Sequence, residues 1–235
     1  MDQNPAYNAL REGGGDTHMV ELYDLAGAGD LRFSPYCFRA KAVLAYKGIP
    51  YRTIPVRFTE KDKIAFSGQD RVPVIRDGDA VRHDSWTIAG YLEQKQPAPS
   101  IFPGPGLKEA CRFFNLYVDR TVHGALFPVV VWDIFTHIEA VDRDYFRRTR
   151  EERLGATLET VASRRDQYRA QMRATLADLE AAVSGQQYFF GLLTYADLCL
   201  LGTLSWVRAV SEEPVLDPFP ALRQWWERLR EQIRL

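Results

Sequence analysis

The segment Ser34-Pro35-Tyr36-Cys37 combines residue types that can start a helix and stabilise an anion. Ser is favoured as an N-cap and Pro at the first helical position, so a helix is expected to begin here. The start of a helix carries a partial positive charge and unpaired N–H groups, which attract an anion. The Ser34 hydroxyl can donate a further hydrogen bond to that anion. The simpler alternative is that Ser34 only caps the helix, which is worth about 1 kcal/mol.

The cysteines and histidines point to no other chemistry. Cys37, Cys111 and Cys199 are odd in number and far apart, so they form neither a disulfide framework nor a metal-ligand spacing. The four histidines also lack such a spacing, and no metal site is expected. Cys37, one turn into the helix, is interpreted as a small buried residue. Thiol transfer through Cys37 alone is the weaker alternative.

Short strands and helices that would position this segment alternate over residues 19–94. The composition predicts strands at 19–23, 51–56, 72–75 and 80–83. Asp77-Gly78 favours a hairpin between the last two, and Pro55 marks its strand as an edge strand or as near its end. Ser85 is expected to cap a second amphipathic helix.

The rest of the chain has a different organisation. Residues 95–106 hold four prolines and are interpreted as a linker, and residues 107–235 are predicted to be helical almost throughout. Thr194 and Asp197 form a capping-box variant ahead of a leucine-rich helix. Residues 1–18 are polar and rich in Gly, which indicates a flexible leader.

Composition excludes several classes of function. A formal net charge of -1, from 30 Lys and Arg against 31 Asp and Glu, argues against a nucleic-acid partner. No apolar run reaches the length of a membrane span, and the first residues lack the apolar core of a signal peptide. Together with the unpaired cysteines, these features favour a reducing compartment, with the cytoplasm as the expected location.

In this order and spacing, four patterns resemble the cytosolic glutathione transferases over about residues 19 to 233. They are the Ser34 segment at the active-site motif, Arg71-Val72-Pro73-Val74 at a segment with a cis proline, Asp84-Ser85 at an acidic-Ser pair, and the capping box at Thr194. The resemblance implies an α/β thioredoxin-like N-terminal domain and an all-α C-terminal domain. A narrower resemblance links the chain to bacterial lignin β-etherases and the fungal etherase-like class, which cleave aryl ethers by glutathione attack.

The resemblance also implies glutathione as the co-substrate. Ser34 would hold its thiolate, and Tyr23, at the end of the first strand, is the second choice for that role. Residues expected to bind the rest of glutathione are Arg71, Val72, Pro73, Asp84 and Ser85. Each has a structural alternative: a packed strand aromatic for Tyr23, a solvated charge for Arg71, a trans proline for Pro73 and a plain helix cap for the Asp-Ser pair.

A second substrate is expected between the two halves. Aromatic residues expected to line its site are Phe33, Tyr36, Phe113, Tyr117 and Trp132. Their number favours an apolar or aromatic electrophile. The resemblance further implies a homodimer. The alternative function is a binding or scaffold protein that keeps this fold without turnover.

Overall fold

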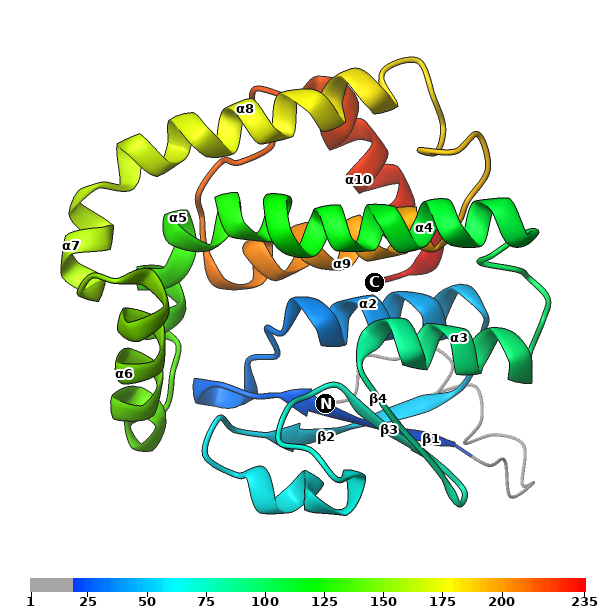
Figure 1. The fold of residues 1–235 in the computed structure, drawn as a ribbon, viewed down its shortest axis with the longest axis horizontal. Coiled ribbons are helices and arrows are strands. Elements are labelled where there is room, and N and C mark those ends of the chain that lie inside the picture. The colour runs from blue at the N-terminus through cyan, green and yellow to red at the C-terminus, as the bar shows by residue number, and fades with distance from the viewer. Residues whose placement is uncertain (1–18) are drawn as a thin grey trace.

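A four-stranded mixed sheet forms the N-terminal half of the computed structural model, which describes residues 19–235 (Figure 1). The strands are β1 (Val20–Leu25), β2 (Tyr51–Val56), β3 (Val74–Asp77) and β4 (Ala80–His83), in the order β2-β1-β3-β4. β1 runs parallel to β2 and antiparallel to β3, and β3 pairs antiparallel with β4. Pro55 therefore lies on an edge strand, which confirms its prediction. The leader predicted for residues 1–18 lies outside the described residues.

The two faces of the sheet are covered differently because strand side chains alternate in direction. Leu22 and Ile75 join the main core with α2 (Pro35–Tyr46) and α3 (Ser85–Lys95). Tyr23 and Val74 point to the opposite face, where they pack on the short 3-10 helix Lys61–Ser67 through Ile64. This α/β arrangement is thioredoxin-like, as expected.

The second half is all-helical and lies against the helix-covered face of the sheet (Figure 1). Its helices are α4 (Pro105–Tyr117), α5 (His123–Thr136), α6 (Arg143–Leu154), α7 (Leu158–Ser163), α8 (Arg165–Val183), α9 (Tyr195–Val210) and α10 (Pro220–Ile233). A π-helical turn at Val118–Val122 joins α4 to α5. α3 ends at Lys95 and α4 begins at Pro105, so the proline-rich segment connects the two halves.

α9 is the central helix of this half, and it packs directly on α2. Its capping box is present as predicted: the Thr194 N–H donates to Asp197 Oδ2 at 3.0 Å. Gly202 lets the two helices approach closely, because a Cβ there would meet the backbone nitrogen of Arg39 at 2.6 Å. The helix contact at Gly202 and Arg39 thus fixes α2 relative to the helical half.

One helix start differs from its prediction. Asp84, not Ser85, is the N-cap of α3: its carboxylate accepts from the Thr87 N–H at 2.9 Å. The backbone of Asp84 has a positive φ of 67°, which turns its side chain toward that N–H. Ser85 is the first helical residue, and it is buried.

Candidate functional site

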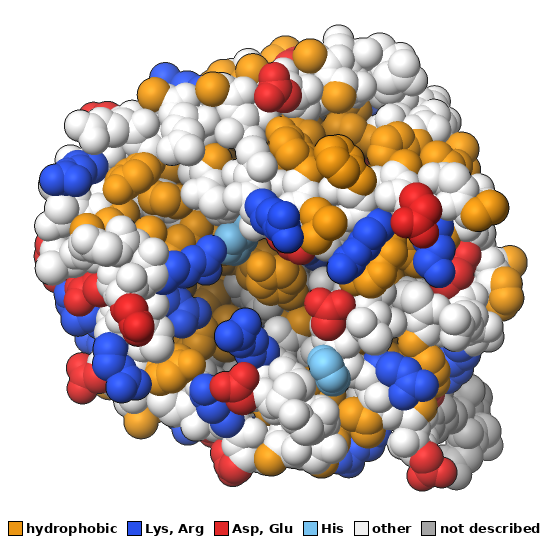
Figure 2. Space-filling view, viewed as in Figure 1, with side chains coloured by type: hydrophobic (Ala, Val, Ile, Leu, Met, Phe, Trp, Pro, Cys, Tyr) orange, Lys and Arg blue, Asp and Glu red, His pale blue; other side chains and the backbone are white. Residues whose placement is uncertain are grey.

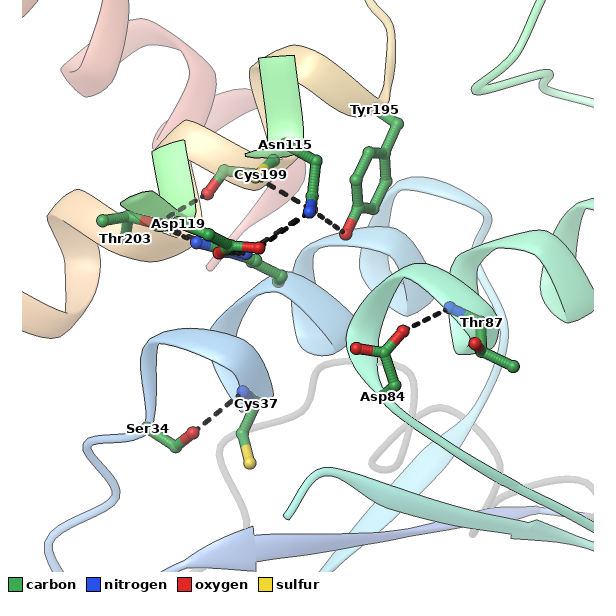
Figure 3. Close-up of polar contacts among 10 residues, drawn as sticks. Ser34, Cys37, Asp84, Thr87, Asn115, Asp119, Tyr195, Cys199 and Thr203 are labelled. Atoms are coloured by element: carbon green, nitrogen blue, oxygen red, sulfur yellow. Dashed lines mark hydrogen bonds and ion pairs between the residues drawn. The ribbon is translucent and has the colours of Figure 1, made fainter. Parts of the chain in front are cut away.

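Ser34 is the N-cap of α2, as the sequence predicted. Its Oγ accepts from the Cys37 N–H at 3.2 Å (Figure 3), and its side chain is 4% exposed at the edge of a cavity. Because Oγ accepts this hydrogen bond, its own proton remains available for donation to a ligand. Pro35 has no N–H, so the Ser34 hydroxyl is an especially important donor at this helix start.

Cys37 lies beside Ser34 but is turned away from the cavity. Its sulfur points toward the sheet (Figure 3), 3.9 Å from the carbonyl oxygen of Tyr23. Burial is the main factor that raises the pKa of the Cys37 thiol well above its usual value, and Asp24 adds to it. A fully buried thiol with a raised pKa is a poor nucleophile.

The segment before β3 has the backbone geometry that the resemblance implied. The Val72–Pro73 bond is cis, which confirms the expectation for Pro73. Val72 lies outside the registers of the described strands, so neither its N–H nor its C=O belongs to the sheet pairing. Arg71 extends into solvent, with its side chain 91% exposed. Val72 and Arg71 both border the same cavity as Ser34.

Asp84 and Ser85 lie at the start of α3 but outside the lining of that cavity. Asp84 is exposed, and one carboxylate oxygen serves as the helix cap (Figure 3). Ser85 is buried, with only 3% of its surface exposed. What Ser85 offers to a ligand is therefore its backbone N–H, one of the unpaired groups of the first helical turn.

The cavity has a volume of about 590 Å³ and lies between the start of α2, the end of β2 and the helices α5 and α6. Hydrophobic side chains fill its interior and Lys and Arg side chains surround it (Figure 2). His123 stacks against Trp206, with ring centroids 4.7 Å apart, and against Phe127 at 5.7 Å. Tyr36 lies 6.1 Å from His123 on the other side. A stack of rings therefore forms one wall, as an aromatic ligand requires.

His123 is neutral in this wall. Burial is the main factor that lowers its pKa, to about 3, and the positive charges of Arg153, Arg39 and Arg150 lower it further. Its Nδ1 is buried and has no hydrogen-bond partner among residues 19–235. A neutral imidazole can stack on an aromatic ligand without bringing a charge into the apolar interior.

The expected aromatic residues divide into two groups. Phe33 and Tyr36 line the cavity. Phe113 does not, because it lies on the outer side of α4 and is 74% exposed. Tyr117 packs on Phe114 and Trp132 on Phe135, also outside the lining. The spacing of aromatic residues on α4 and α5 did not show which side of each helix faces the cavity.

Tyr23, the second choice for thiol activation, also lies outside the lining. Its ring packs on Phe66 at 5.1 Å, on the sheet face that the 3-10 helix covers. Burial is the main factor that raises the pKa of its hydroxyl. The structure therefore brings Ser34, and not Tyr23, to the cavity.

α6 contributes one wall of the cavity, which was not predicted from the sequence. Phe146, Thr149, Arg150 and Arg153 of this helix all line the cavity. Their spacing of i, i+3, i+4 and i+7 is that of one helix face, so a helical plot of residues 143–154 was the available signal.

Residues 19–235 contain no helix with the length and apolar character needed to cross a bilayer. Within the same range, no group of three or more His, Cys, Asp or Glu side chains is arranged to hold a metal ion.

Comparison with known proteins agrees with this fold. Residues 30–100 match the family model "Glutathione S-transferase, N-terminal domain", and residues 111–234 match "Glutathione S-transferase, C-terminal domain". The probable glutathione S-transferase GSTU6 of Oryza sativa subsp. japonica is 26% identical over 230 residues, with 88% of this chain and 86% of the relative covered.

Two fungal crystal structures are similar to the whole fold. A glutathione S-transferase of Ceriporiopsis subvermispora in complex with glutathione has a TM-score of 0.78 and 25% identity, with 92% of this chain and 96% of that chain covered. Glutathione transferase GSTFuA3 of Phanerochaete chrysosporium has a TM-score of 0.80 and 24% identity, with the same coverage. A thioredoxin-like half joined to an all-helical half is the architecture of this class of protein. The chain belongs to the glutathione S-transferase family.

Proposed function

We propose that this chain is a glutathione transferase that activates the thiol of glutathione at Ser34 for attack on an apolar or aromatic electrophile in the cavity. The observation that carries the proposal is the Ser34 geometry: its hydroxyl accepts from the Cys37 N–H and borders the cavity. Family membership supplies glutathione as the co-substrate.

Activation of the thiol needs a lower pKa, because most free glutathione is protonated near neutral pH. The Ser34 hydroxyl donates to the thiolate sulfur, and the positive end of α2 adds a favourable field. Both interactions favour the charged form over the neutral one. The proton of the thiol is released to solvent, and the thiolate remains beside the ring-lined cavity.

The rest of glutathione lies along two segments of the thioredoxin-like half. The N–H and C=O of Val72 pair with the cysteinyl backbone, because Val72 lies outside the registers of the sheet. Asp84 accepts from the α-ammonium of the γ-glutamyl group, and the Ser85 N–H donates to its α-carboxylate. Arg71 supplies a positive charge near the peptide.

The electrophile occupies the cavity that Phe33 and Tyr36 line. In a displacement, the sulfur forms a bond to carbon while the leaving group departs with the electron pair of its own bond. Cleavage of a β-aryl ether is one such reaction: the C–S bond forms, the C–O bond breaks and a phenolate leaves. The narrower resemblance to the etherases supports this reaction, and the ring-lined cavity is compatible with an aryl substituent.

The alternative function is a glutathione-binding or hydrophobic-ligand-binding protein without turnover. Retention on immobilised glutathione is expected for both functions, so it tests only the binding site. Turnover of a panel of aryl ethers and haloaromatics with glutathione separates them. Product formation above the uncatalysed rate supports the transferase, whereas retention without product from any member of the panel supports the binding protein.

Two broader expectations follow from the family and the cysteines. Cys37, Cys111 and Cys199 are all buried and form no disulfide with one another, which is compatible with the cytoplasmic location proposed here. The proposed assembly is a homodimer, which rests on the family resemblance.

A further inference from the structure

The cavity carries a strong excess of positive charge. Five basic side chains and one carboxylate line it: Arg57, Lys61, Arg71, Arg150 and Arg153, with Asp70. Arg57 pairs with Glu60 at 2.9 Å, and Lys61 pairs with Asp70 at 2.6 Å, so these two charges are compensated locally. Arg71 lies 3.8 Å from the same Asp70 and extends into solvent, so the excess inside the cavity resides mainly on the arginines of α6.

Arg150 and Arg153 are three residues apart on α6, on the face that lines the cavity. Neither has a carboxylate partner among residues 19–235 within ion-pair distance. Arg147, on the same helix but outside the cavity lining, pairs with Glu151 at 2.8 Å and with Glu159 at 2.8 Å. The two α6 arginines that line the cavity therefore have no anionic partner within the described part of the chain.

Arg150 has unused hydrogen-bonding capacity inside the protein. Its guanidinium lies 5.0 Å from the ring centre of Phe58 and 4.7 Å from that of Phe146, and its Nη1 donates to Thr149 Oγ1 at 2.8 Å. A guanidinium has five N–H donors, and burial without an anion is unfavourable. Burial is indeed the main factor that lowers the pKa of Arg150. An anionic ligand group would compensate this charge.

Arg153 extends the same positive field to the aromatic wall. Its guanidinium lies 5.0 Å from the ring centre of Phe127, which in turn stacks on His123. Both arginines therefore rest on rings that line the cavity. A ligand ring against these walls would bring its own substituent within the field of two guanidinium groups.

We propose, on the basis of the transferase function above, that the electrophile is an aromatic compound with an anionic group, such as a carboxylate, and that Arg150 and Arg153 bind this group. A carboxylate matches the fork of N–H donors of a guanidinium, and its ring matches the apolar interior. The two arginines therefore determine which electrophiles bind, while Ser34 stabilises the reactive thiolate of glutathione.

A matched pair of electrophiles tests this proposal: 4-chloro-3-nitrobenzoate, which is anionic, and 4-chloro-3-nitrobenzamide, which is neutral. With either, the glutathione thiolate forms a C–S bond at the chlorinated carbon, the C–Cl bond breaks, and chloride leaves with the bonding electron pair. KM is measured for each at saturating glutathione, and the glutathione Kd is measured by calorimetry.

The variants are Arg153→Gln, whose side chain is exposed and whose loss should not affect folding, and Arg150→Lys and Arg150→Gln. Each Gln variant should raise KM for the benzoate by about tenfold, because it removes a charge-assisted hydrogen bond. KM for the benzamide and the glutathione Kd should change less than about twofold, a shift of under about 0.4 kcal/mol. Arg150→Lys should restore part of the benzoate affinity. Arg148→Gln, an exposed residue of α6 outside the cavity, is the control and should change nothing.

Two results would overturn the proposal. One is an equal effect of Arg153→Gln and Arg150→Gln on benzoate and benzamide, which would mean that the arginines do not select for charge. The other is a weaker glutathione Kd with an unchanged benzoate-to-benzamide ratio, which would assign the arginines to the glycyl carboxylate of glutathione. If the wild-type protein turns over neither these compounds nor any member of the electrophile panel above, the transferase function fails. Calorimetric binding of benzoate against benzamide then still decides the charge preference.

Discussion

The guanidinium of Arg39 on α2 lies 2.6 Å from the carboxylate of Asp119, measured from Nη1 to Oδ1, and so joins the two halves of the protein. The Arg39 side chain is fully buried, and it also donates to Thr203 Oγ1 of α9 at 3.0 Å and to Asn115 Oδ1 (Figure 3). α2 carries Ser34 at its start, so this interdomain network positions the reactive end of the helix against the cavity.

Replacement of Arg39 should destabilise the whole protein. Arg39→Met leaves Asn115 and Thr203 without their buried donor and should lower the free energy of unfolding by about 3 kcal/mol. Arg147→Met is the control: its ion pairs are at the surface, so the loss should stay below about 1 kcal/mol. Urea denaturation followed by circular dichroism measures both. Similar losses in the two variants would mean that the Arg39 network contributes no more than a surface pair.

Asp84 has two roles that different substitutions can separate. Asp84→Asn keeps a side-chain oxygen for the helix cap but removes the negative charge, so stability should change little while glutathione binding weakens by about 1.5–3 kcal/mol. Asp84→Ala should weaken binding and also lower stability by about 1 kcal/mol, because the cap of α3 is lost. Calorimetry with glutathione and thermal unfolding give the two readouts. Unchanged glutathione affinity in Asp84→Asn would place the α-ammonium elsewhere.

The buried His123 should make the protein less stable in mild acid. Its pKa is about 3 in the folded chain and near 6.5 when unfolded, so below pH 6.5 only the unfolded state takes up this proton. Between pH 7 and pH 5 this difference should cost about 2 kcal/mol of the free energy of unfolding. His123→Phe keeps a ring in the stack and should lack this part of the pH dependence. Parallel pH profiles for the two proteins would show that His123 is protonated in the fold.

The proposed homodimer predicts a mass of twice the 26.9 kDa chain. Light scattering at micromolar concentration measures it directly. A mass equal to that of one chain at this concentration would contradict the proposed homodimer.

Much of this architecture could be predicted because its signals are local. Ser34-Pro35 specifies a helix start, Thr194 and Asp197 specify a capping box, and the prolines around residue 100 specify a linker. The two half-domains follow from the order of these elements. The cap of α3 was misplaced by one residue because Asp and Ser are both favoured caps, and only the backbone of Asp84 distinguishes them.

The composition of the cavity was much less predictable. Which aromatic residues face the cavity depends on the rotation of α4, α5 and α6 about their axes. The periodicity of apolar residues indicates which face of a helix is buried, but not which element packs against that face. Phe113 has the residue type expected of a substrate site but is exposed to solvent. Trp206, by contrast, lines the cavity, although the sequence indicates only that its helix, α9, is apolar. Arg150 and Arg153 are charged, and charged side chains on a helix are usually solvated, so only their tertiary contacts reveal them as wall residues.

The pKa of the thiol of bound glutathione tests the central claim most directly, and the absorbance of the thiolate in the ultraviolet measures it. In the wild-type complex this pKa should lie below that of free glutathione. Ser34→Ala should raise it by about one to two units, since one hydrogen bond to a charged group is worth about 1.5–3 kcal/mol, while glutathione affinity stays nearly unchanged. Tyr23→Phe should leave it unchanged, because Tyr23 packs on the opposite face of the sheet. A thiol pKa that is unaltered in Ser34→Ala, or that rises only in Tyr23→Phe, would contradict the assignment of Ser34 as the activating residue.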